Sequence, residues 1–201
     1  MTNPSPKSVL KRYPGGSIFQ GFGENPADYA PIGYPAGHPG WDILAYQGAP
    51  IVACLSGTVI AVATDPVRLG GISCWIITPD NKIMHSYGHL QSLLVSPGQE
   101  VIEGQQIGTM GNTGFVISGG TKYWGNAPAG RGVHLHLNIV PLDTATLKPL
   151  YPNNGTGGSV DPTPYFVASI KPEPPSQIVL LQRLVELYRS LIRLKGGEPV
   201  A

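Results

Sequence analysis

The chain alternates apolar and polar residues in short runs separated by glycine and proline, a pattern typical of β-strands joined by tight turns. The clearest run is residues 132–138, Gly-Val-His-Leu-His-Leu-Asn, in which apolar residues alternate with two histidines and an asparagine. Because side chains two apart on a strand point to the same face, His134 and His136 are expected to stand side by side. A histidine pair at this spacing indicates a metal or proton-transfer site, or else a solvated sheet face.

Strand-like runs recur through most of the chain. They cover residues 17–23, 42–44, 50–54, 57–63, 72–78 and 82–90. A hairpin turn is predicted at Asp80-Asn81. Residues 115–131 predict a long irregular connection, and a loop of that length beside a site is typical of a binding wall. We therefore predict a mainly β fold, an antiparallel β-sheet or sandwich with long groove loops.

Both ends of the chain depart from this pattern. Residues 1–16 predict a flexible arm, so the folded domain is expected over residues 17–165. Apolar residues then recur at intervals of three and four, which predicts an amphipathic α-helix over residues 176–195 after a proline-rich linker at 166–175. Such a helix either packs on the domain or, through its wide apolar stripe, drives self-association or contact with a partner or envelope.

The composition mainly excludes certain functions and locations. The 201 residues carry a net charge of +1, which gives no electrostatic case for binding nucleic acid. No apolar run reaches the roughly 18–20 residues of a transmembrane helix, and the polar start is not a secretory signal as it stands. Cys54 and Cys74 lie in apolar runs, so buried thiols are favoured over a disulfide.

Candidate site residues also occur before the histidine pair. His38 and Asp42 are separated by a proline and a glycine that disfavour a helix. A loop entering a strand can still bring both side chains to one point, and the alternative is an ordinary turn that Asp42 caps. In the run 82–90, alternation places His85, Tyr87 and His89 on one face. His85 is expected to be a solvated strand histidine, with a position lining a groove as the alternative.

Three ligands of nitrogen, nitrogen and oxygen type with an open fourth position are the ligand set of a catalytic zinc. A structural zinc site more often uses four ligands that include cysteines, and neither cysteine here falls in a metal-ligand spacing. The composition of the candidate residues therefore favours a catalytic metal over a structural one.

Taken in order, these motifs resemble a known family. Gly37-His38-Pro39-Gly40-Trp41-Asp42-Ile43, Tyr87-Gly88-His89-Leu90 and His134-Leu135-His136 are similar to the lysostaphin/LytM-type zinc metallopeptidases, which cut peptidoglycan peptides. Glycine-containing motifs at 20–26, 57–59, 98–101, 104–108 and 111–114 extend the resemblance to roughly residues 17–165. Three short motifs in this order are a far more specific signal than any one of them alone.

The resemblance implies that His38, Asp42 and His136 bind one Zn²⁺. It also implies that His89 and His134 are the catalytic histidines that stay off the metal. Zinc lowers the pKa of a bound water to about 7. His134, next to a ligand, is placed to take the proton of that water, although His89 could share the role.

Candidate contacts to the substrate are less well defined. In the family a tyrosine ahead of the first zinc histidine can assist the oxyanion, and Tyr34 is the nearest candidate. Tyr123 and Trp124 lie in the connection 115–131 and are candidate wall residues. The link between Gly114 and His134 is longer than the short turn usual in the family, so the groove wall is expected to differ.

The leading hypothesis is a zinc endopeptidase that hydrolyses peptide stems or cross-bridges of bacterial peptidoglycan. The alternative is a non-catalytic module of the same fold that binds peptidoglycan or regulates other wall hydrolases. Without an export signal, we expect a phage-type lysin, made in the cytoplasm and acting on the wall after release. A wall hydrolase carried on a virion is the alternative route.

Overall fold

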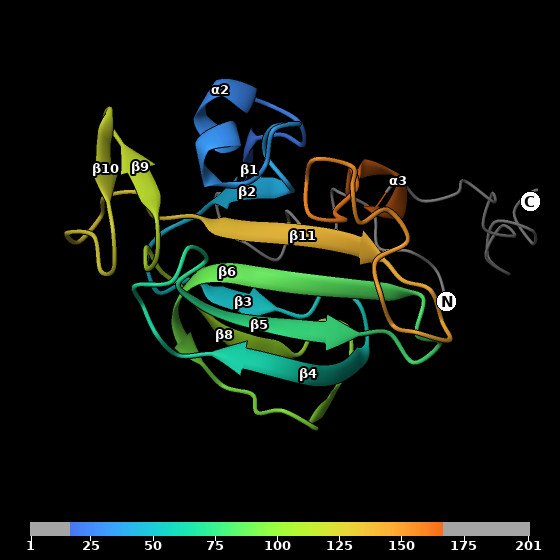
Figure 1. Ribbon diagram of the computed structural model, residues 1–201. Helices are drawn as coiled ribbons and strands as arrows, with labels where there is room; N and C mark the ends of the chain where they lie inside the picture. The colour runs from blue at the N-terminus through green and yellow to red at the C-terminus, as the bar shows by residue number, and fades with distance from the viewer. Residues whose placement is uncertain (1–16, 167–201) are drawn as a thin grey trace, which may run out of the picture. The chain divides into compact units, whose positions relative to one another are not determined.

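The computed structural model describes residues 17–166, which form short strands with three brief helical segments (Figure 1). The strands are β1 (Ser17–Gln20), β2 (Trp41–Leu44), β3 (Pro50–Val52), β4 (Gly57–Ala63), β5 (Ile72–Ile77), β6 (Ile83–Leu93), β7 (Glu100–Val101), β8 (Gln106–Met110), β9 (Val116–Ser118), β10 (Thr121–Tyr123) and β11 (Leu135–Pro141). The helical segments are α2 (Pro26–Tyr29), η1 (Ala30–Ile32) and α3 (Thr163–Phe166). Within the described residues, no helix has the length and apolar character that crossing a membrane requires. The expected N-terminal arm and C-terminal helix lie outside the described residues.

Nine of these strands form one antiparallel sheet, and β9 and β10 pair separately. Its order is β1-β2-β11-β6-β5-β4-β7, with each neighbouring pair antiparallel. β3 pairs with β8, and β8 also pairs with the end of β6, so these two strands lie behind β5 and β6 (Figure 1). This arrangement confirms the predicted mainly antiparallel β fold.

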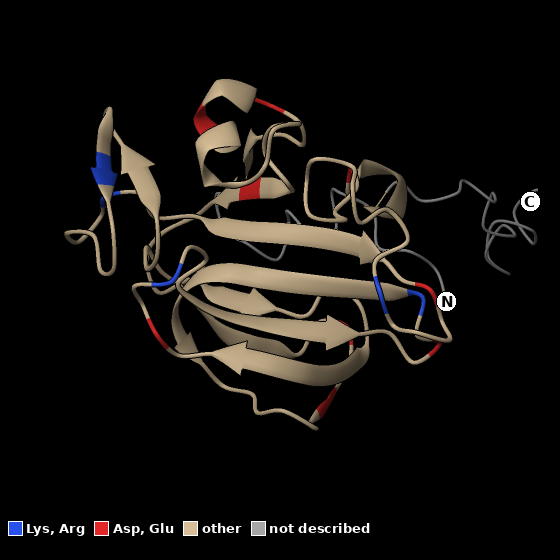
Figure 2. Ribbon diagram, in the orientation of Figure 1, with Lys and Arg blue, Asp and Glu red and all other residues tan. Residues whose placement is uncertain are grey.

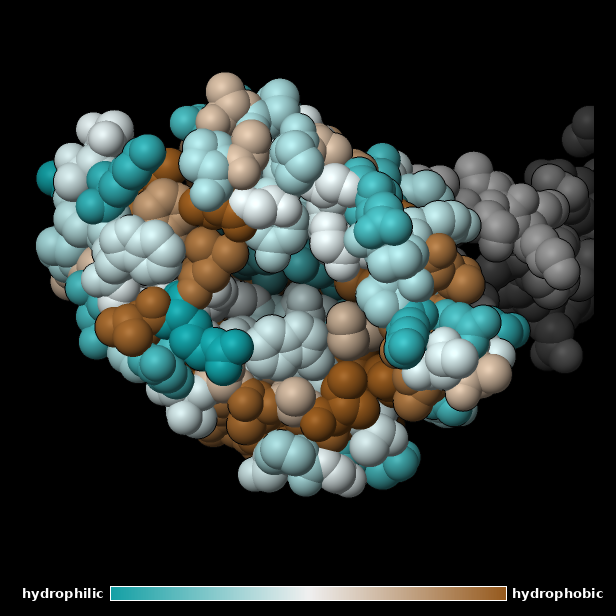
Figure 3. Space-filling model, viewed as in Figure 1, coloured by the Kyte–Doolittle hydropathy of each residue, from teal (hydrophilic) through white to brown (hydrophobic). Residues whose placement is uncertain are grey.

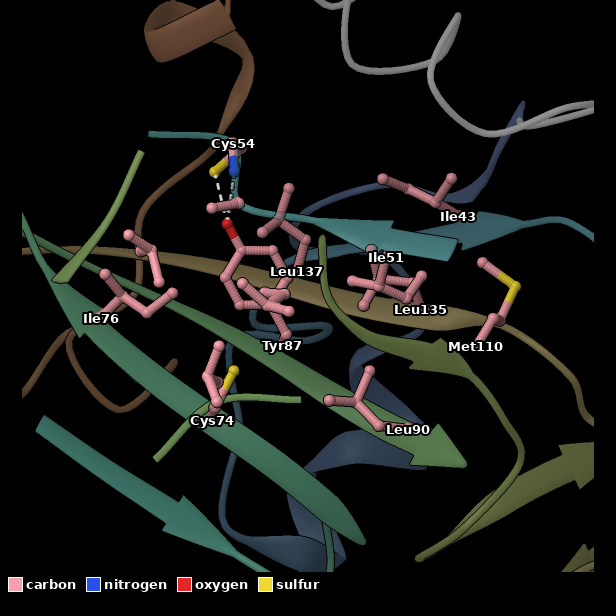
Figure 4. Packing of buried hydrophobic residues seen from close by; sticks show 14 of the residues in the cluster. Ile43, Ile51, Cys54, Cys74, Ile76, Tyr87, Leu90, Met110, Leu135 and Leu137 are labelled. Carbon is pink, nitrogen blue, oxygen red and sulfur yellow. Dashed lines mark hydrogen bonds between the residues drawn. The ribbon is translucent and has the colours of Figure 1, made fainter. Parts of the chain in front are cut away.

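The core lies between the sheet and the β3–β8 pair. Leu135, Leu137 and Ile139 alternate along β11, and all three are buried in this core. They pack with Ile51 of β3 and Met110 of β8 (Figure 4). Burying a large aliphatic side chain contributes roughly 1.5–3 kcal/mol. The alternation therefore fixes which face of β11 is covered, and it turns the histidines of this stretch to the other face.

The end of the described segment also packs into this core. Phe166 of α3 is fully buried, and its ring centroid lies 5.2 Å from that of Trp41. Trp41 immediately precedes Asp42 on β2, so this contact supports the strand that carries a candidate ligand. The packed domain thus includes Phe166, the first residue of the segment 166–175 that we expected to be a linker; the rest of that segment lies outside the described residues.

The two cysteines are buried without a disulfide between them, as the sequence favoured. The hydroxyl of Tyr87 accepts a hydrogen bond from the backbone N–H of Cys54 at 2.7 Å and donates one to the Cys54 sulfur at 3.0 Å (Figure 4). Burial raises the pKa of the Cys74 thiol to about 12, so this thiol stays protonated.

His85 is not solvated, and the expectation that it would be is wrong. Its side chain is fully buried on the core face of β6, and its Nδ1 lies 2.9 Å from the Tyr87 hydroxyl. Burial lowers the pKa of His85 to about 3. His85 and Tyr87 do share a face, as alternation predicted, but it is the face that β3 and the chain following it cover.

The buried His85 predicts a specific acid sensitivity. An unfolded histidine takes up a proton below about pH 6.5 whereas the folded one does so only near pH 3, so stability is lost as pH falls through this window. The loss is about 1.4 kcal/mol per pH unit from this group. We expect His85→Leu to abolish this part of the slope, measured by denaturant unfolding of chelator-treated protein at pH 6.5 and 4.5. Every other titrating group is common to both proteins, so parallel stability curves would contradict the prediction.

Candidate metal centre

The first candidate group is assembled by pairing between β2 and β11. Asp42 stands directly opposite His136 in the antiparallel register. His38 comes from the loop that leads into β2 and is fully buried. Gly40 lets this loop approach β11, because a Cβ there would lie 2.3 Å from the backbone oxygen of Leu137. The loop therefore brings His38 to the same point as the paired residues.

Three side-chain atoms converge at that point. His38 Nε2 lies 3.0 Å from Asp42 Oδ1 and 2.9 Å from His136 Nδ1, and the latter two atoms are 2.8 Å apart. Atoms of three tetrahedral zinc ligands lie roughly 3.3–3.6 Å apart when their bonds are about 2.0–2.2 Å long. The triangle therefore needs to open by only about half an ångström to accept a zinc ion. Within the described residues this is the one group of three or more His, Cys, Asp or Glu side chains that is placed to hold a metal.

A hydrogen bond at Nδ1 of His38 determines which ring nitrogen carries the proton. His38 Nδ1 lies 2.9 Å from the backbone oxygen of Gly21. A carbonyl oxygen only accepts hydrogen bonds, so Nδ1 carries the proton and a neutral His38 turns an unprotonated Nε2 to the triangle. One proton can satisfy two of the converging atoms, whereas a divalent cation accepts lone pairs from all three. The donor set therefore fits a metal of the zinc type.

Charge in the triangle is also suited to a cation. Burial alone would raise the pKa of the Asp42 carboxyl, but the charges and hydrogen bonds of the surrounding histidines outweigh burial and hold this pKa well below its ordinary value. Burial lowers the pKa of His136, although Asp42 opposes the effect. The site thus presents a carboxylate beside a neutral imidazole, and these are the protonation states that bind a metal.

His89 reaches the same space because β6 bulges. Ile72 pairs with Leu90 but Cys74 pairs with Tyr87, so one residue of β5 faces two on β6. His89 has a φ of +60°, in the left-handed region that residues other than glycine rarely adopt. The extra residue turns His89 away from the core. The prediction that it shares a face with His85 and Tyr87 is therefore wrong, although its place in the candidate site is not.

His89 and His134 stand together beside the triangle. Their ring centroids are 4.5 Å apart, and Nε2 of His134 lies 3.6 Å from Asp42 Oδ2. The Nδ1 of His89 lies 2.7 Å from the Thr113 oxygen, and that of His134 lies 2.8 Å from the Gly132 oxygen. Each Nδ1 therefore donates to a carbonyl, so Nε2 is the nitrogen of each ring that is free to accept a proton. Burial lowers the pKa of His89 well below its ordinary value, and the neighbouring histidines add to this effect.

These residues lie in a cavity of about 960 Å³ that opens on the face of the sheet opposite the core. The face is hollowed at its centre (Figure 3), and the red segment of β2 in Figure 2 is Asp42, the acidic residue of that strand. One wall comes from the α2–η1 segment and another from the connection after Gly114. The structure thus joins the five residues that the motifs suggested: Asp42, His89, His134 and His136 line the cavity, and the fully buried His38 contacts Asp42 and His136.

The cavity wall differs in detail from the sequence expectation. The connection 115–131 is not irregular throughout, because β9 and β10 pair as a hairpin. Residues 115–120 line the cavity, whereas Tyr123 and Trp124 do not, and Trp124 packs on Phe115 with ring centroids 4.7 Å apart. The connection does form a wall, but residues 115–120 line the cavity in place of the two aromatic residues that we named.

Both tyrosines of the α2–η1 region line the cavity, and Tyr29 is the one that contacts the metal triangle. Its ring centroid lies 5.1 Å from that of His38, and its hydroxyl donates to Gln20 Oε1 at 3.3 Å. Burial, with the charge of Asp42, raises the pKa of Tyr29, so the phenol keeps its proton. Tyr34, chosen because it is nearer to His38 in sequence, has no such ring contact. The turn of α2 brings Tyr29 closer, and nothing in the local sequence signals this.

Comparison with known proteins gives a consistent result. Residues 36–149 match Peptidase family M23. Peptidoglycan DD-endopeptidase ShyA of Vibrio cholerae is 31% identical over 105 residues, which are 52% of this chain and 20% of that protein. The murein hydrolase activator NlpD of Salmonella typhimurium is 32% identical over 99 residues, 49% of this chain and 23% of that protein. The chain spans less than a third of the length of the curated relatives it matches.

Two solved structures have a similar fold. The catalytic domain of the antimicrobial peptidase lysostaphin from Staphylococcus simulans has a TM-score of 0.54 at 22% identity, covering 78% of this chain and 96% of that chain. A zinc containing peptidase from Vibrio cholerae has a TM-score of 0.52 at 27% identity, covering 76% of this chain and 38% of that chain. The antiparallel sheet described above is thus the fold of lysostaphin-type catalytic domains.

Proposed function

Because the chain belongs to peptidase family M23, we propose that it is a zinc-dependent endopeptidase that hydrolyses peptides of bacterial peptidoglycan. The observation that carries the proposal is the convergence of His38 Nε2, Asp42 Oδ1 and His136 Nδ1 within 3.0 Å of one another. The similarity to ShyA, a peptidoglycan DD-endopeptidase, supports the choice of substrate. The route by which the protein reaches the cell wall stays a prediction.

Zinc held by the triangle would lower the pKa of a water molecule in its open coordination position and polarise the scissile carbonyl. His134 is the better placed of the two remaining histidines to take a proton from that water. Its Nε2 lies 3.6 Å from Asp42 Oδ2, so this nitrogen stands next to the metal position. Asp42 would thus contact the metal through its Oδ1 atom and His134 through its Oδ2 atom.

His89 and Tyr29 complete the proposed arrangement. His89 is more deeply buried than His134, and protonating both rings at a centroid separation of 4.5 Å would place two positive charges side by side. A proton on His134 therefore disfavours a second proton on His89. Tyr29 keeps its phenolic proton and lines the cavity, so its hydroxyl can turn from Gln20 Oε1 to donate a hydrogen bond to the substrate carbonyl oxygen as charge develops there.

A second candidate function is activation of other wall hydrolases without turnover, which the similarity to the activator NlpD favours. Activation without turnover does not require the Nε2 atoms of His38, His89 and His134 to face the site. A regulator would leave purified peptidoglycan intact in the presence of zinc and would increase the activity of an added hydrolase. The two functions are therefore separated by the same digestion experiment.

The test is metal removal followed by reconstitution. Protein treated with a chelator should lose its ability to release new amino termini from purified peptidoglycan, because His38, Asp42 and His136 cannot activate water by themselves. Adding about one equivalent of Zn²⁺ should restore release, with magnesium as the control ion. Mass spectrometry of the products identifies the bond that is cut. Peptidoglycan left uncut by zinc-loaded protein would contradict the endopeptidase proposal.

A further inference from the structure

The cavity wall carries one permanently positive side chain. Among the described residues that line the cavity, Arg68 is the single lysine or arginine. It lies in the loop between β4 and β5, where it is the blue segment in Figure 2, and its side chain is exposed. No ion pair within residues 17–166 involves its guanidinium. An arginine over a groove without a carboxylate of its own is available to a ligand.

The backbone beneath Arg68 is held in place. The N–H groups of Gly114 and Phe115 donate to the backbone oxygens of Pro66 and Leu69 at 2.8 and 2.9 Å. Gly71 closes the loop by donating to the Arg68 oxygen at 2.9 Å, and a Cβ on Gly71 would lie 2.3 Å from the hydroxyl of Thr113. This packing leaves no room for the loop to shift toward Thr113, so the position of the guanidinium varies mainly through its own side chain.

The same loop is hydrogen-bonded directly to the candidate catalytic residue His89. The backbone N–H of His89 donates to the oxygen of Gly70 at 2.8 Å, and Thr113 holds the His89 ring through its own backbone oxygen. Arg68 is two residues from Gly70, so their Cα atoms are at most roughly 7 Å apart. An extended peptide advances about 3.3 Å per residue. A group bound by Arg68 is therefore within a few residues of the bond at the metal triangle.

The cavity wall formed by α2 carries a negative charge. Asp28 of α2 lines the cavity and is exposed, and no lysine or arginine among the described residues joins it there. A peptide lying across the groove thus meets a carboxylate on the α2 wall and a guanidinium on the β4–β5 wall. This polarity disfavours an anionic group near Asp28 and favours one near Arg68.

We propose that Arg68 binds a carboxylate of the peptide substrate next to the scissile bond. The groove would then favour peptide stems with free carboxylates over uncharged cross-bridges. This inference rests on the proposed function, because it names the class of peptide that the same site takes. A guanidinium pairs with a carboxylate through two parallel hydrogen bonds, which gives the subsite geometric selectivity as well as charge selectivity.

The test compares two forms of one substrate. Cross-linked muropeptide dimers with free stem carboxylates are compared with the same dimers after conversion of these carboxylates to carboxamides. For the zinc-loaded protein, we expect KM to be roughly 5- to 50-fold lower for the carboxylate form, between the effects of an exposed and a bidentate ion pair. Arg68→Gln should remove this preference with little change in kcat, and Arg68→Lys should keep part of it. Lys122→Gln, which removes an exposed charge outside the cavity, is the matched control.

A binding measurement separates this inference from the proposed function. Calorimetric titration of each dimer into zinc-loaded His134→Ala, which is expected to keep the metal and lose turnover, gives a Kd ratio without hydrolysis, and Arg68→Gln is tested in the same background. A ratio that favours the carboxylate form and is lost in Arg68→Gln supports the subsite, even if neither dimer is cut and the endopeptidase proposal fails. Equal Kd and KM values for the two forms, or a preference that survives Arg68→Gln, would overturn the role of Arg68.

Discussion

Replacing His136 with alanine is expected to abolish both zinc uptake and hydrolysis of peptidoglycan. The change removes Nδ1 from a triangle whose other two atoms, His38 Nε2 and Asp42 Oδ1, lie 2.9 and 2.8 Å from it. Two protein ligands hold zinc far more weakly than three, so bound zinc should fall from about one equivalent to nearly none after dialysis. Atomic emission analysis of the dialysed protein measures the metal, and release of new amino termini measures activity.

The matched control for this variant lies two residues further along the same face of β11. Asn138 also lines the cavity, but no atom of it belongs to the triangle. Asn138→Ala should therefore keep about one equivalent of zinc. Zinc retained at the wild-type level by His136→Ala would show that the metal, if bound, is held elsewhere.

His134→Ala should have the opposite signature, with zinc kept and turnover lost. His134 is outside the triangle and contacts it only through Asp42 Oδ2 at 3.6 Å, so its removal leaves all three ligands in place. Loss of a group that moves a proton in the transition state typically costs about 10²–10⁴-fold in rate. The measurement is kcat on a defined muropeptide dimer, beside the zinc content of the same sample.

Comparison with His89→Ala assigns the proton transfer between the two histidines. If His134 takes the proton, its variant should lose more activity than the His89 variant, whose ring is more buried and farther from Asp42. Equal loss of zinc from the His134 and His136 variants would contradict the division between ligand and catalytic residue.

Local sequence predicted the parts of the site that depend on one strand. The alternation in residues 132–138 placed His134 and His136 on one face of a strand, and both line the cavity. This succeeds because the side-chain period of a strand is set by its own backbone. The motifs around His38 and Asp42 indicated a site for a further reason, which is their resemblance to a family.

Features that depend on contacts between distant parts of the chain could not be predicted from local sequence. The bulge at His89 arises where one residue of β5 faces two of β6, so it is a property of the pair of strands. His85 is buried because β3 and the following Cys54 cover its face, which no pattern within residues 82–90 reveals. Tyr29 reaches His38 through the turn of α2, whereas spacing along the chain pointed to Tyr34.

The most direct measurement is zinc-edge X-ray absorption spectroscopy on the protein reconstituted with one equivalent of Zn²⁺. Coordination by His38, Asp42 and His136 predicts two imidazole nitrogens at about 2.0–2.1 Å with oxygen making up the remainder. A sulfur ligand at about 2.3 Å, or zinc surrounded by oxygen without imidazole, would contradict a metal centre built from these three side chains.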